Sequence, residues 1–226
     1  MDEATKTNQF RPNSFFKTYL SGTVLDIGAG KDLVCAHAQG FDMEDGDANN
    51  LDHYFPPESF DTVHSSHSLE HMHNPANALT AWWKLVKSGG YLIIVVPDED
   101  LYEQGIWPSV FNSDHKSTFR LDKKQSWSPV SYEIRTLCAA LQGGVIVSAQ
   151  CQSNNFDVTL LFPKHLKPKS KYTFWQKKMF SIAKRLPNGG KELVKKIQID
   201  LIKKGYPFDQ TKYDATAQIE IIVQKK

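Results

Sequence analysis

The chain has 226 residues, of which 40% are hydrophobic and 23% charged, values that suit one globular domain and exclude a wholly disordered chain. The polar N-terminus lacks the regions of a signal peptide, and the longest apolar run, 91–96, is too short to span a bilayer. The three cysteines, Cys35, Cys138 and Cys151, have neither metal-ligand nor disulfide spacing, so we expect a reducing cytoplasm.

The charge is unevenly distributed along the chain. Residues 164–204 hold 13 basic and two acidic residues, a net charge of +11. The remaining residues hold 14 basic and 23 acidic ones, a net charge of −9. This asymmetry predicts that the two parts meet different partners.

The first half of the chain predicts three buried parallel strands, at 23–27, 60–65 and 91–96. Residues 74–90, between the last two, predict a helix that Asn74 caps and that ends at Gly89-Gly90. A strand, a helix and a returning strand form a right-handed βαβ crossover.

The second half predicts a helix at 131–141 and strands at 145–149 and 217–223. Between these strands, apolar residues recur at helical spacing among lysines at 175–186 and again at 194–201. We therefore expect a pair of basic amphipathic helices. Their apolar stripes would either pack on the domain or meet an anionic membrane surface.

A glycine loop, Asp26-Ile27-Gly28-Ala29-Gly30, follows the first strand, and a short helix is expected around 32–39. Glycine lets a ligand approach the backbone, so the loop fits a dinucleotide, S-adenosylmethionine, or a tight turn without a ligand. The third glycine of the dinucleotide pattern is replaced by Leu33, and the next acid, Asp42, follows Gly30 after 12 residues rather than about 20. Both features count against an NAD-dependent oxidoreductase.

Several short motifs follow the glycine loop in a definite order. They are Gly46-Asp47-Ala48, Ser59-Phe60-Asp61, Leu69-Glu70-His71, Leu85-Val86-Lys87-Ser88-Gly89-Gly90 and Val96-Pro97. Over residues 23–97 this order resembles the class I S-adenosylmethionine-dependent methyltransferases, in particular the type 11-like small-molecule family.

The resemblance implies an α/β fold, a Rossmann-like three-layer sandwich. Its mostly parallel, seven-stranded sheet would have an antiparallel last strand. Residues 1–226 would form a single methyltransferase domain, with 164–204 as a basic helical insertion between the last two strands.

The resemblance also implies a set of residues that bind S-adenosylmethionine and its product S-adenosylhomocysteine. They would be Asp26 at the amino group, Gly28 and Gly30 at the methionine part and ribose, Asp42 at the ribose hydroxyls, Asp47 and Ala48 at the adenine, and Ser65, Ser66 and His67 on the methionine side. The chain departs from the family at Asp32, where many members have glycine, and in the short distance from Asp42 to Asp47. These departures leave open whether Asp42 or Glu44 is the ribose acid.

The loop after the strand at 91–96 supplies the candidate catalytic residues, His115 with Asp114 beside it. A histidine near neutral pKa can act as general base for an acceptor hydroxyl, although a packing role for His115 is an equal alternative. The segment from His67 to His71 also fits the H-x-x-E-H zinc pattern. Because Glu-His is normal here in the resembling family, we expect no metal.

The predicted activity is methyl transfer to an oxygen or nitrogen of a small molecule. We suggest a surface-glycan precursor or phospho-intermediate, as in polysaccharide biosynthesis, modified in the cytoplasm with 164–204 at an anionic membrane surface. A non-catalytic S-adenosylmethionine-binding module and an RNA methyltransferase are the alternatives. A nucleic-acid partner is not favoured, since the Asn/Asp-Pro-Pro-Tyr motif of enzymes that flip bases is absent after the strand at 60–65.

Overall fold

The computed structural model describes residues 3–169 and 190–226 and is built on a six-stranded sheet with the order β2-β1-β3-β4-β8-β7. The strands are β1 Val24–Ile27, β2 Gln39–Phe41, β3 Phe60–Ser66, β4 Val86–Pro97, β7 Gly144–Gln152 and β8 Gln218–Lys225. The first four are mutually parallel, whereas β8 runs antiparallel to both of its neighbours. The mostly parallel sheet with an antiparallel last strand is thus confirmed.

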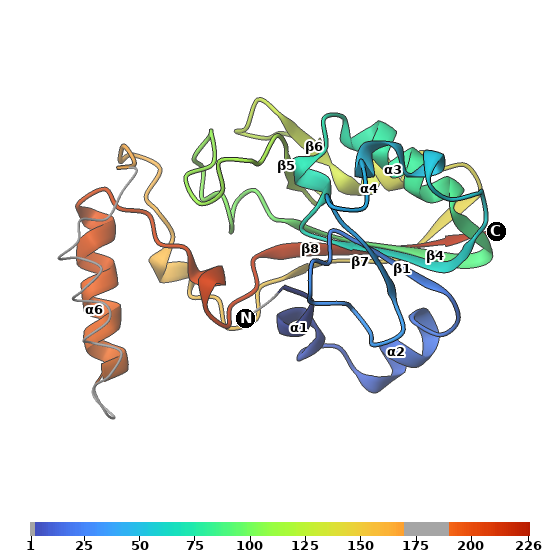
Figure 1. Cartoon of the computed structure of the whole chain (residues 1–226). Coiled ribbons are helices and arrows are strands. Elements are labelled where there is room, and N and C mark those ends of the chain that lie inside the picture. The colour runs from blue at the N-terminus through green and yellow to red at the C-terminus, as the bar shows by residue number, and fades with distance from the viewer. Residues whose placement is uncertain (1–2, 170–189) are drawn as a thin grey trace.

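Helices cover both faces of the sheet (Figure 1). On one side lie α1 Glu3–Asn8 and α2 Asn13–Tyr19, and on the other α3 Pro75–Lys84 and α4 Ile134–Ala139. The central strands are buried on both faces because both are covered: Leu25, Val63 and Leu92 lie on one face, and Val24 and Ile93 lie on the other. A small parallel pair, β5 Thr118–Arg120 and β6 Ser131–Glu133, completes the three-layer α/β domain.

Within the described residues the main sheet has six strands where seven were expected. The missing strand would lie between Asp42 and Asp47, but four residues cannot hold a helix and a strand. A turn occupies these residues instead, and the 3-10 helix η1, Ala48–His53, follows Asp47. The strand at this edge of the sheet is therefore β2.

The short helix expected after the glycine loop is also absent, since residues 31–38 form turns. The buried Asp26 carboxylate accepts a hydrogen bond from the backbone N–H of Val34 at 2.6 Å. This bond turns the chain back toward β1 within a few residues. The loop to β2 is too short for a helix to form on the way.

The predicted helix at 74–90 begins as expected but ends early. The Asn74 side chain caps it by accepting from the N–H of Asn77. The helix stops at Lys84, and Gly89-Gly90 belong to β4, where the pairing with β3 shifts register. Gly89 has a φ of +80°, so these glycines form an irregularity in a strand rather than a helix end.

The predicted helix at 131–141 is divided in the structure into β6 and α4, whereas the strands predicted at 145–149 and 217–223 are confirmed by β7 and β8. Of the basic helical pair, 175–186 lies outside the described residues. The second member is α6, Gly190–Lys203, set apart from the sheet in Figure 1.

The apolar side of α6 packs on a small separate cluster. Leu201 and Ile202 are buried, and Ile202 contacts a group that includes Leu160, Phe162 and Phe208. None of the helices in the described part of the chain has the length and apolar character needed to cross a membrane.

Candidate functional site

A cavity of about 510 Å³ opens where β1 and β3 end. Ligands of open α/β sheets bind at the carboxyl ends of the strands, and the volume suits a small-molecule cofactor. The lining residues are Glu3, Ala4, Asp26, Gly28, Ala29, Gly30, Lys31, Asp32, Asp42, Ser66 and His67. Six of the nine residues predicted to bind the cofactor therefore line one cavity.

The glycine loop forms one wall of this cavity. Gly28 has a φ of +72°, and a Cβ at this position would overlap the hydroxyl of Ser68 and lie 2.9 Å from its Cβ. Gly30 has a φ of +55°, but a Cβ there would meet only Asp42 Oδ2, at 3.7 Å. Gly28 is therefore required by both conformation and space, and Gly30 by conformation alone.

Asp26 is almost completely buried below the loop. Its Oδ1 lies 2.6 Å from His64 Nδ1, and its Oδ2 accepts from Val34. Since both oxygens are engaged by the protein, the principal structural role of Asp26 is to hold the loop around Gly28.

The structure separates the two candidates for the ribose acid. Asp42 lines the cavity, and its Oδ2 accepts from the N–H of Gly30 at 2.8 Å. Glu44 is exposed and lies outside the residues that line the cavity. The geometry therefore favours Asp42.

Asp47, Ala48 and Ser65 do not line the cavity. The Asp47 carboxylate accepts from the backbone N–H and side chain of Asn49 and caps η1. The hydrogen bonds from Asn49 lower the pKa of Asp47 below its usual value. The Ala48 carbonyl accepts from Trp82 Nε1, and Ser65 is buried within β3.

Ser66 and His67 form the wall on the β3 side. Ser66 Oγ is buried without a hydrogen-bond partner, although it belongs to a residue that faces the cavity. Burial disfavours a charged His67, but Glu70 and Glu3 outweigh this effect and raise its pKa to about 9. The orphaned hydroxyl of Ser66 is a group that a bound ligand would satisfy.

The N-terminal helix α1 supplies part of the cavity wall, a feature that no sequence motif predicts. Its residues Glu3 and Ala4 contribute to the lining. The N–H of Thr5 donates to Asp32 Oδ2 at 2.8 Å, joining α1 to the loop. Asp32, which replaces a family glycine, thus fixes the helix over the cavity.

The predicted catalytic pair is arranged differently from the expectation. His115 Nδ1 lies 2.6 Å from Glu103 Oε1, and both side chains are buried. Asp114 instead lies beside His71, with Oδ2 2.8 Å from His71 Nδ1. The partner that orients His115 is therefore Glu103 rather than the adjacent Asp114.

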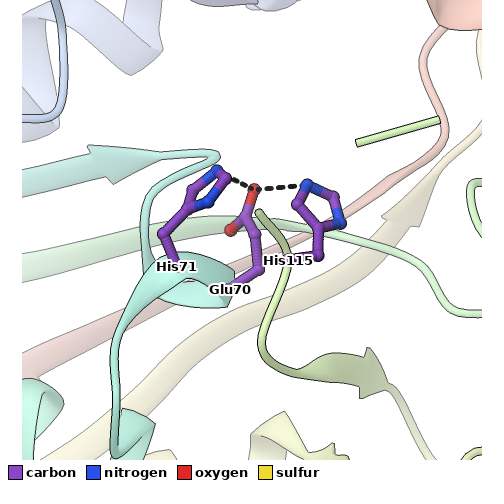
Figure 2. A group of neighbouring side chains, drawn as sticks. All are labelled: Glu70, His71 and His115. Atoms are coloured by element: carbon purple, nitrogen blue, oxygen red, sulfur yellow. Dashed lines mark ion pairs between the residues drawn. The ribbon is translucent and has the colours of Figure 1, made fainter. Parts of the chain in front are cut away.

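Backbone hydrogen bonds bring this loop to the end of β3. The N–H groups of Lys116 and Ser117 both donate to the carbonyl of Glu70, which lies in the 3-10 helix η2, Leu69–His71. As a result Glu70, His71 and His115 each offer a ligand atom within 4.8 Å of the others (Figure 2). The sequence motif contains the first two residues but gives no sign of the third.

Comparison with known proteins identifies the family to which this chain belongs. A family model described as "Methyltransferase domain" matches residues 6–158. A search of curated proteins finds no significant match.

Two solved structures show the same fold. A S-adenosylmethionine-dependent methyltransferase from Archaeoglobus fulgidus matches with a TM-score of 0.53 and 15% identity, covering 98% of this chain and 93% of that one. A proposed methyltransferase from Bacillus halodurans matches with a TM-score of 0.51 and 13% identity, covering 99% and 98%. The chain therefore belongs to the methyltransferase-domain family and is an enzyme with the class I, Rossmann-like fold of S-adenosylmethionine-dependent methyltransferases.

Proposed function

We propose that this enzyme transfers the methyl group of S-adenosylmethionine to an oxygen or nitrogen atom of a small-molecule acceptor. The observation that carries the proposal is the cavity at the ends of β1 and β3, which places the glycine loop, Asp42 and the unpartnered hydroxyl of Ser66 around one space. Buried imidazoles and carboxylates adjoin this space at His67. The groups proposed to bind the cofactor therefore lie next to the ionisable groups proposed to act on the acceptor.

S-adenosylmethionine supplies an already activated methyl group, so the main tasks of the protein are orientation and exclusion of water. Gly28 and Gly30 would allow the methionine part to approach the loop, and Asp42 would accept hydrogen bonds from the ribose hydroxyls. Ser66 Oγ and His67 would lie on the methionine side. Asp47 and Ala48 would lie toward the adenine, and Asp26 and Ser65 would support the cavity wall from within the protein.

The acceptor loses a proton if its reacting group is a hydroxyl or an ammonium. His115 is the candidate general base, with Nδ1 held by Glu103 and Nε2 3.8 Å from Glu70 Oε1. Asp114 contributes by orienting His71. A buried imidazole fixed in one tautomer by a carboxylate suits this role.

The acceptor class we propose is an anionic one, a surface-glycan precursor or phospho-intermediate, modified at the cytoplasmic face of a membrane. Exposed lysines of α6 support this, because Lys196 and Lys203 have no acidic partner in the described part of the chain. Leu193 on the same helix is 43% exposed.

Sedimentation with anionic and neutral vesicles tests the proposed contact with a membrane. Binding to anionic vesicles that weakens with salt is expected, and its absence would refute this part alone.

Calorimetry with S-adenosylhomocysteine, followed by methyl transfer to sugar phosphates, amines and RNA, tests the activity. We expect binding to the wild-type chain and turnover on a small anionic acceptor. Binding without turnover on any acceptor would favour the non-catalytic module, and turnover on RNA would favour the RNA methyltransferase. No binding at all would overturn the proposal.

A further inference from the structure

Three hydrogen-bond acceptors converge next to the cofactor cavity with no donor between them. His71 Nε2 lies 4.0 Å and His115 Nε2 3.8 Å from Glu70 Oε1, as the dashed lines of Figure 2 show. Both oxygens of Glu70 are buried without a hydrogen-bond partner. These distances are too long for hydrogen bonds, so neither imidazole satisfies the buried Glu70 carboxylate.

The Nδ1 atoms of both imidazoles are hydrogen-bonded to carboxylates, which leaves the Nε2 atoms facing Glu70 as acceptors. His71 Nδ1 donates to Asp114 Oδ2 at 2.8 Å, and His115 Nδ1 donates to Glu103 Oε1 at 2.6 Å. A neutral imidazole with its proton on Nδ1 has a lone pair on Nε2. This carboxylate–histidine arrangement is the one that orients metal-binding histidines.

The local charge balance also favours a cation. Glu70 and Glu103 are both fully buried, and within the described residues neither lies at ion-pair distance from a lysine or arginine. Lys116, which lies next to His115, pairs with Asp114 instead, at 3.6 Å. The cationic group near Glu70 Oε1 is the His67 imidazole, whose Nδ1 lies 3.6 Å away. One imidazolium balances only one of the two buried carboxylates.

We propose that Glu70, His71 and His115 bind a divalent first-row transition metal ion. Two imidazole nitrogens and one carboxylate oxygen form the ligand set of catalytic zinc sites and of related Fe(II) sites. The three ligand atoms lie within 4.8 Å of one another, so small side-chain rotations bring them to bonding distance from one ion. Mg²⁺ is disfavoured because it prefers oxygen ligands.

The site is accessible and borders the cavity. His71 is 24% exposed, which gives an ion a path from solvent, and His67 both lines the cavity and faces Glu70. Three protein ligands leave coordination positions open, as catalytic metal sites do. We infer that an oxygen of the methyl acceptor occupies one of these open coordination positions, an inference that rests on the proposed function. His115 would then serve as a ligand instead of the general base.

The test uses the full chain stripped of metal, with Zn²⁺ in calorimetry and Co²⁺ in visible absorption. We expect one ion per chain and Co²⁺ bands typical of nitrogen and oxygen ligands. Glu70→Gln, His71→Gln and His115→Gln should each weaken Zn²⁺ binding by at least about 100-fold. Asp114→Asn should weaken it by about 10-fold to 100-fold by releasing His71.

His73→Gln is the matched control, because His73 is exposed and lies two residues from His71 but outside the cluster. The Zn²⁺ affinity of this variant should equal that of the wild type. Affinity for S-adenosylhomocysteine, measured on the same samples, reports that each variant is folded and separates this inference from the proposed function. Absence of Zn²⁺ and Co²⁺ binding, or binding that survives both His71→Gln and His115→Gln in chains that bind S-adenosylhomocysteine, would overturn the metal site.

Discussion

The glycine-loop wall of the cavity and the cluster of Glu70, His71 and His115 lie close together but are built in different ways. The loop is one continuous segment whose conformation is specified by its own residues, above all Gly28. The cluster joins η2 to a loop more than 40 residues further along the chain, held by the bonds from Lys116 and Ser117 to the Glu70 carbonyl. The first can be recognised in a sequence motif, whereas the second exists only in the folded chain.

The largest expected effect comes from adding a methyl group to the loop. Gly28→Ala places a Cβ against Ser68 and forces a φ of +72° on a residue with a side chain. We expect loss of detectable S-adenosylhomocysteine binding in calorimetry. The conformational part alone costs about 1–2 kcal/mol.

Gly89→Ala is the matched control for Gly28→Ala. Gly89 also has a positive φ, +80°, but a Cβ there meets nothing within 4 Å. This variant should lose a similar amount of conformational stability in denaturant unfolding and keep its cofactor affinity. Equal loss of S-adenosylhomocysteine binding in both variants would mean that the effect of Gly28→Ala does not come from the conformation of the glycine loop.

The second expected effect concerns the ribose acid. Asp42→Asn removes the charge of a carboxylate that lines the cavity, whereas Glu44→Gln changes an exposed residue outside the lining. A hydrogen bond to a charged group contributes about 1.5–3 kcal/mol, so Asp42→Asn should weaken S-adenosylhomocysteine binding by about 10-fold to 100-fold. Glu44→Gln should leave it unchanged. The reverse result would move the ribose site to Glu44.

Much of the fold could be predicted because buried parallel strands appear as apolar runs. Residues 23–27, 60–65 and 91–96 correspond to β1, β3 and the second half of β4. The predictions failed where the same sequence pattern, a glycine pair or a helical periodicity, is compatible with two different structures. Gly89-Gly90 looked like a helix end but forms a strand irregularity, and the segment starting at Ser131 divides into a strand and a helix.

The candidate site could be predicted only where its residues belong to motifs of the resembling family, as Ser66 and His67 also do. Asp26, Gly28, Gly30 and Asp42 follow a family order and line the cavity. The partner of His115 could not be found this way, because adjacency in sequence suggested Asp114 and the fold supplies Glu103. Likewise, nothing in the first eight residues indicates that α1 lines the cavity and is hydrogen-bonded to Asp32.

The smallest expected effect comes from the opposite end of β3, and it tests whether a change there alters the cofactor site or the metal site. Asp61, near the start of β3, accepts from the N–H and hydroxyl of Thr23 and from Lys87, and the bonds from Thr23 lower its pKa to about 2. The folded pKa is below the unfolded value, so the carboxylate stabilises the protein above about pH 4. This contribution is lost as the pH falls toward 2.

Asp61→Asn should therefore lower the melting temperature slightly at neutral pH, and the difference from the wild type should shrink between pH 4 and pH 2, as thermal unfolding would show. The effect is small because Asp61 is 41% exposed and solvent screens its charge. Cofactor and Zn²⁺ affinities at neutral pH should be unchanged. If either affinity fell in a fully folded variant, the ends of β3 would be coupled, and neither the loop nor the cluster could be treated as a local structure.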